Sequence, residues 1–109
     1  MKPVVWIGDS LERLREFPAD ARRDAGYQLE RAQAGEVPMD WKALPSVGLG
    51  VKEIRVRSRG AFRVIYLARF AEAVYVLHAF QKKSRKMTRI DIGLARMRFA
   101  ALVQERRQP

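Results

Sequence analysis

The sequence contains no cysteine and one histidine, and these absences exclude several kinds of site. Without cysteine there is no disulfide framework, thiolate nucleophile or cysteine-bound zinc, a composition that suits a reducing cytosol. The histidine, His78, and the scattered acidic residues of the second half show no familiar metal-ligand spacing, so we expect no metal and no cofactor. A phosphate-cradling glycine loop and a serine-hydrolase elbow are also missing.

Long apolar runs are absent as well. No run approaches the roughly 20 residues of a membrane span, and the start MKPVVWIGDS turns polar too soon for a signal peptide. We therefore expect a cytoplasmic protein with no membrane partner. With 109 residues, of which 48% are hydrophobic, residues 1–109 fit a single compact domain.

Acidic residues are scarce in the second half of the chain. Residues 1–50 hold seven Lys or Arg against eight Asp or Glu, whereas residues 51–109 hold fifteen against four. The formal net charge of +10 is therefore concentrated after residue 50. Such clustering favours a polyanion partner over charge that merely aids solubility, and the candidates are nucleic acid, an anionic membrane surface or an acidic protein.

Three apolar runs predict a small sheet at the centre of the fold. They are rich in β-branched and aromatic residues and cover residues 52–57, 62–67 and 73–80. Gly60 can take the positive φ of a short hairpin, so the first two strands should be antiparallel neighbours. Because side chains alternate, Ile54 and Val56 should lie on one face and Arg55 on the other.

Before these strands, the pattern predicts a short strand at residues 4–7 and two helices. Asp9 is the expected N-cap of the first helix, with Glu12 at its third position. The second helix should span residues 19–34 and bury one face made of Ala21, Ala25, Leu29 and Ala32. Residues 35–50 predict a long loop, from which Trp41 and Leu44 fold back onto the core.

After the strands, a basic link leads into a final helix. Thr88 is the expected N-cap, and the helix should run over residues 89–105. Its predicted inner face comprises Ile90, Leu94, Met97 and Ala101. The element order predicts an α+β domain with an antiparallel sheet, two N-terminal helices and a C-terminal helix, in which strand 4–7 joins as an edge strand.

Cations on this scaffold are the candidate functional residues. Arg55 and Arg63 lie on the first two strands, and Lys82 and Lys83 follow the third. Attack of a 2′-hydroxyl on the adjacent phosphodiester builds negative charge that fixed guanidinium and ammonium groups stabilise without a metal. Plain phosphate binding uses the same residues. An alternative role for Arg63, which lies inside an apolar strand, is an ion pair with Glu53 across the hairpin.

The segment EIRVRSRGAFRVIYLARFAEAVYVLHAFQKKSRKMTRIDIGLAR resembles the core of the RelE/HigB superfamily of type II toxins, particularly its phage-derived HigB-like branch. Its marks are an E-I-R strand, a G-x-F-R-V-x-Y strand and an H-A-F-x-K-K strand end, followed by a basic link to a helix. The resemblance covers most of residues 36–105. It implies a RelE-like fold and a metal-independent endoribonuclease, an mRNA interferase that cuts message on the ribosome and inhibits translation. It also implies a cognate antitoxin partner, which we expect to be of the helix-turn-helix type.

Carried over by motif, the resemblance assigns binding and polarisation of the scissile phosphate to Arg55, Arg63, Lys82 and Lys83. The other cations of the hairpin and the link are expected to bind RNA: Lys52, Arg57, Arg59, Arg85, Lys86 and Arg89.

The sequence departs from the family at the proton-transfer residue. No tyrosine follows Tyr75, and the C-terminal histidine of some relatives is missing. The catalytic acid or base is therefore open between Lys82, Lys83 and His78, although a core imidazole is the favoured interpretation of His78. ParE-like relatives of the same fold poison DNA gyrase, and a non-catalytic basic nucleic-acid-binding module is a third alternative.

Overall fold

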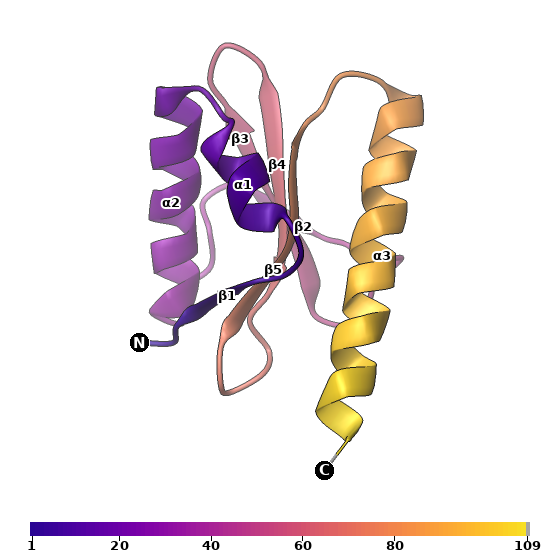
Figure 1. The fold of residues 1–109 in the computed structure, drawn as a ribbon. Helices are drawn as coiled ribbons and strands as arrows, with labels where there is room; N and C mark the ends of the chain where they lie inside the picture. Colours follow the sequence, from indigo (N-terminus) through magenta and orange to yellow (C-terminus); the bar gives the residue numbers. More distant parts are fainter. Residues whose placement is uncertain (109) are drawn as a thin grey trace.

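A computed structural model describes residues 1–108 and places five strands in one sheet, in the order β1-β5-β4-β3-β2. β1 runs parallel to β5, and every other neighbouring pair is antiparallel. The strands are β1 (Val4–Trp6), β2 (Trp41–Ala43), β3 (Val51–Arg57), β4 (Ala61–Leu67) and β5 (Val74–Gln81). Figure 1 shows α1 and α2 on one side of this sheet and α3 on the other, which confirms the predicted α+β class and the edge position of β1.

The face under α1 (Ser10–Arg15) and α2 (Ala19–Gln33) follows the sequence pattern closely. The four predicted inner residues of α2 are all buried, and they pack with Ile54 and Val56 of β3. Three of the four are alanines, and such small side chains let the helix axis approach the strands. Apolar spacing was therefore sufficient to predict this layer.

The opposite layer, under α3 (Arg85–Arg107), corrects two predictions. The helix begins four residues earlier than expected because Ser84, not Thr88, is the N-cap; its Oγ accepts a hydrogen bond from the backbone N of Met87 at 3.2 Å. The predicted inner face was wrong, since Ile90 and Met97 are 65% and 69% exposed. The apolar residues that pack on the sheet are Ile92, Ala95, Phe99 and Leu102.

Two further predictions before β3 were wrong. Residues 41–43 form β2, which pairs with β3 at the sheet edge, where the sequence predicted only a loop. Trp41 stays 36% exposed, with Lys52 Nζ 4.7 Å from its ring centroid, whereas Leu44 is buried as predicted. Asp9 is the N-cap residue of α1 as predicted, but its carboxylate makes no capping hydrogen bond and binds Arg13 and Arg98 instead.

Within the described part of the chain, no helix combines the length and apolar content needed to cross a bilayer.

Candidate functional site

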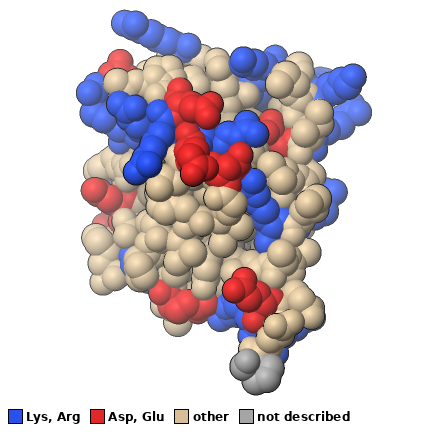
Figure 2. Space-filling view, in the orientation of Figure 1, with Lys and Arg blue, Asp and Glu red and all other residues tan. Residues whose placement is uncertain are grey.

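Basic side chains gather at one end of the sheet. Lys82 N donates to Ala61 O at 2.8 Å, and Ala61 pairs with Arg57, so Lys82 and Arg57 flank the start of β4. The β3–β4 turn and the first turn of α3 lie at this same end (Figure 1), and Figure 2 shows blue side chains bordering it on both sides. We call the following residues the basic end: Arg57, Arg59, Lys82, Lys83, Arg85, Lys86 and Arg89.

All seven residues of the basic end are exposed. None of them forms an ion pair with a carboxylate of residues 1–108. Exposed cations without an internal counter-ion are available to neutralise phosphates of a nucleic acid. The cations that the sequence placed in the hairpin turn and the basic link therefore lie at the same end of the folded domain.

Arg63 does not belong to this exposed group. Its Nε lies 3.2 Å from Glu53 Oε1, and both side chains are more than nine-tenths buried. Its Nη1 also donates to Phe62 O at 3.1 Å. The alternative interpretation of Arg63, a partner of Glu53 across the hairpin, is confirmed, and a buried guanidinium of this kind is stable only because it is paired.

Arg55 and Lys52 are also occupied within the protein. Arg55 Nε lies 3.1 Å from Asp40 Oδ1, in a pair whose side chains are 31% and 47% exposed. Because side chains alternate along β3, the Lys52 side chain lies on the α2 face of the sheet. There it lines a separate pocket, away from the basic end. Of the sequence-predicted cations, the structure thus brings seven together and keeps Lys52, Arg55 and Arg63 apart from them.

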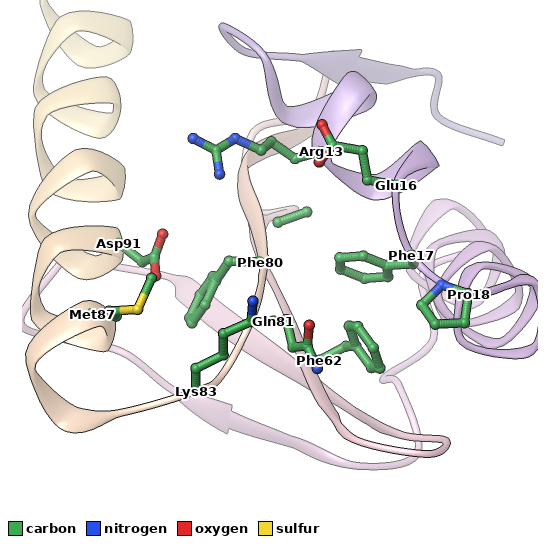
Figure 3. Close-up of a pocket in the computed structure, with 11 residues that line it drawn as sticks. Arg13, Glu16, Phe17, Pro18, Phe62, Phe80, Gln81, Lys83, Met87 and Asp91 are labelled. Carbon is green, nitrogen blue, oxygen red and sulfur yellow. The ribbon is translucent and has the colours of Figure 1, made fainter.

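A cleft of about 350 Å³ lies beside the basic end, between α1, the last residues of β5 and the start of α3. It exists because β1 stops at Trp6, opposite Val76, so the rest of β5 has no neighbouring strand on this side. Figure 3 shows Arg13 extending from α1 toward α3, with Asp91 on the opposite wall and Phe80 between them. The charged and amide side chains that line it are Arg13, Glu16, Gln81, Lys83 and Asp91.

His78 lies behind Asp91 and is fully buried. Its Nε2 is 2.6 Å from Asp91 Oδ1, and its Nδ1 is 3.3 Å from Arg98 Nη1. Because a guanidinium only donates, Nδ1 accepts, and the ring hydrogen sits on Nε2 and is donated to Asp91. Burial lowers the pKa of His78, although the Asp91 carboxylate opposes this shift. Both ring nitrogens are engaged, so the imidazole orients Asp91 and does not itself reach the cleft.

Arg98 connects this pair to α1. It donates to Leu77 O at 2.9 Å and to Asp9 Oδ1 at 2.5 Å. Hydrogen bonds from Arg13 and Arg98 hold the pKa of Asp9 at about 2. Gly8, at φ 57°, leaves room for the guanidinium, because a Cβ there would lie 2.7 Å from Arg98 Cζ. The Asp9 carboxylate therefore stays charged near neutral pH, and its bond to Arg98 helps to fix one wall of the cleft.

Sequence reasoning missed the cleft because its residues come from three separate elements. Arg13, Gln81 and Asp91 form no contiguous motif, and the alternation of β5 says nothing about where its neighbouring strand ends. No group of three His, Cys, Asp or Glu side chains able to hold a metal ion occurs within residues 1–108.

A family model described as "Phage derived protein Gp49-like (DUF891)" matches residues 12–100. The matched region includes the basic end and all residues that line the cleft. No curated protein matches the chain.

Stability should depend on pH through His78. Its pKa lies below the ordinary value of 6.5 in the fold, so the unfolded chain takes up a proton first. The contribution of the neutral ring is complete above pH 6.5 and is lost as the pH falls below it. We expect the thermal midpoint to drop between pH 7.5 and pH 5.5, and this drop to shrink in His78→Gln, because His78 is the chain's single histidine. A wild-type midpoint that is equal at both pH values would contradict the assignment.

The two arginine pairs should differ in their effect on stability. Glu53→Ala leaves Arg63 buried without its counter-ion, and we expect a loss of about 3–5 kcal/mol of unfolding free energy in urea titrations. Asp40→Ala, which breaks the half-exposed pair with Arg55, is the matched control and should cost less than about 1 kcal/mol. Equal losses in the two variants would be inconsistent with a buried pair under the hairpin.

Proposed function

The chain belongs to the Gp49-like family of phage-derived proteins, and from this premise we propose that it is the toxin of a toxin–antitoxin system and cleaves messenger RNA on the ribosome. The family is commonly associated with RelE/HigB-like toxins, so membership is consistent with a toxin. The observation that carries the nuclease proposal is the basic end: seven exposed cations without an internal counter-ion, beside a cleft that contains a carboxylate. The exposed cations can bind a polyanionic substrate, and the carboxylate can accept a proton during cleavage.

The proposed reaction needs no metal ion. The 2′-hydroxyl of one nucleotide attacks the adjacent phosphorus, the O2′–P bond forms, and the P–O5′ bond breaks. The products are a 2′,3′-cyclic phosphate and a 5′-hydroxyl end. Lys83, which lines the cleft, and Lys82 beside it stabilise the negative charge that builds on the phosphoryl oxygens.

Asp91 is the proposed acceptor of the 2′-hydroxyl proton. Its side chain is 15% exposed and lines the cleft, while its Oδ1 accepts the hydrogen bond from His78. A carboxylate held by a buried imidazole is fixed in position, which general base catalysis requires. The Lys83 ammonium donates a proton to the leaving 5′-oxygen, and the proton held by Asp91 then passes to the Lys83 amine, directly or through water, which restores both groups.

Arg55 and Arg63 have secondary parts in this proposal. The ion pair between Arg55 and Asp40 is partly exposed to solvent, so a phosphate can compete with Asp40 for the Arg55 guanidinium. Arg63 stays with Glu53 and supports the hairpin that carries Arg57. The proposal therefore moves the main phosphate contacts from the strands to the strand end and the cleft.

The double variant Lys82→Gln/Lys83→Gln should lose most cleavage. We expect cuts in ribosome-bound message, mapped by primer extension after in vitro translation, to fall by about 10² or more, because transition-state charge loses its donors. Lys42→Gln/Arg107→Gln also removes two exposed cations, at the far strand and the far end of α3, and should cleave like the wild type. Equal loss in both variants would mean that net charge alone matters. Intact message with inhibited DNA supercoiling would support a ParE-like gyrase poison instead.

Asp91→Asn should lower the rate of cleavage without weakening RNA binding. The amide oxygen can still accept from His78, so the fold is kept, but the proton acceptor is lost; we expect a single-turnover rate about 10² to 10⁴ lower. Glu16→Gln, at the other carboxylate of the cleft, is the control and should retain the rate. A parallel loss of rate and affinity in Asp91→Asn would show that Asp91 only shapes the site.

A further inference from the structure

α3 has a second apolar face that the rest of residues 1–108 leaves largely exposed, with Leu94 half-buried at its centre. It consists of the residues that the sequence pattern had placed inside: Ile90, Leu94, Met97 and Ala101, preceded by Met87. Three of these are large and strongly exposed, with 48% for Met87, 65% for Ile90 and 69% for Met97. Single exposed apolar side chains are ordinary, but these five recur at spacings of three and four residues along one helix. We call them the outer stripe.

This spacing is that of a helix-pairing seam. Alternating steps of three and four residues are the a and d positions of a heptad, which face a second helix in a left-handed pair. From Met87 to Ala101 the stripe runs about 20 Å along the helix. Its occupant should therefore be a helix of similar length rather than an extended strand or a small molecule.

Gly93 adds an independent observation. It lies between Ile90 and Met97 on the same side of α3, and a Cβ placed there would meet nothing within 4 Å. A glycine inside a helix costs roughly 1 kcal/mol relative to alanine, and no contact within the described residues requires one. Its missing side chain allows the backbone of a second helix to come close.

The charges beside the stripe specify the chemistry of this second helix. Lys86 and Arg89 lie beside its first turns and are exposed, and Arg96 is exposed while its Nε donates to Ser46 O at 2.9 Å. Of the two carboxylates on α3, Asp91 faces His78, and Glu105 is exposed one turn beyond Ala101, at the opposite end of the stripe from Lys86 and Arg89. A second copy of this chain would bring cations against cations along the seam, which is unfavourable. An acidic partner would place its carboxylates opposite these arginines and the lysine.

We propose that the outer stripe is the docking surface for an acidic amphipathic helix of a second protein. Met87 belongs both to the stripe and to the lining of the cleft, so a helix seated there ends at the cleft rim beside the basic end. In a toxin–antitoxin pair this helix would be the antitoxin's and would cover the site; that consequence rests on the proposed function, whereas the docking does not.

The test uses two synthetic helical peptides of about three heptads, with leucine at a and d and either glutamate or lysine at the flanking positions. Fluorescence anisotropy with the full chain should show binding of the glutamate peptide and none of the lysine peptide. Ile90→Glu/Met97→Glu should weaken the glutamate peptide by at least about tenfold. The control Val37→Glu/Met39→Glu adds the same charge at exposed apolar residues outside the stripe and should bind like the wild type.

Gly93→Gln separates docking from folding. A side chain that stabilises the free helix should raise the thermal midpoint and yet weaken the glutamate peptide. Undiminished binding in both stripe variants would overturn the proposal, because the peptide would then be held elsewhere, as at the basic end. A wild-type dimer in sedimentation equilibrium that Ile90→Glu/Met97→Glu dissociates would also overturn it in favour of a second copy. Cleavage of message by this stripe variant is measured separately, so failed docking and failed nuclease activity remain distinguishable.

Discussion

The guanidinium of Arg98 joins three elements around the half of β5 that lacks a neighbouring strand on the β1 side. It belongs to α3, binds Leu77 O and His78 on β5, and binds Asp9 at the start of α1. Apolar burial is non-directional, so it sets how closely α3 approaches the sheet but only loosely how the helix is rotated. Charged hydrogen bonds are directional and fix that rotation. The rotation in turn decides that Asp91 faces the cleft and that the outer stripe faces solvent.

The same constraint explains which parts of the fold could be predicted. Strand 52–57 and the inner face of α2 follow an apolar period, strand 62–67 is a nearly continuous apolar run, and the structure confirms all three. α3 carries two apolar stripes, and the correct one is interrupted by Asp91 and Arg98, whose partners lie far away in the sequence. β2 is three residues long and exposed at each of them, so it has no period to detect.

The candidate site was predictable to a similar extent. Composition was sufficient for the basic end, because its cations fall in two short stretches of the sequence, residues 57–59 and 82–89. It was not sufficient to distinguish free cations from paired ones. For Arg63 the sequence left open a pair with Glu53 or a role in the site, and nothing in the sequence linked Arg55 to Asp40. The cleft needed tertiary structure, since Arg13 and Asp91 have no local relationship.

The chain order of the cleft has a consequence for biosynthesis. Asp9 and Arg98 are 89 positions apart, and β1 finds its partner only when β5 has been made. Contacts of such long range form late, and a domain of this size folds as a unit. A ribosome that has translated the first two helices and the hairpin has therefore produced no cleft. The surface assigned to the proposed cleavage is complete only once elongation has passed Arg98, the last residue of the network that holds its wall.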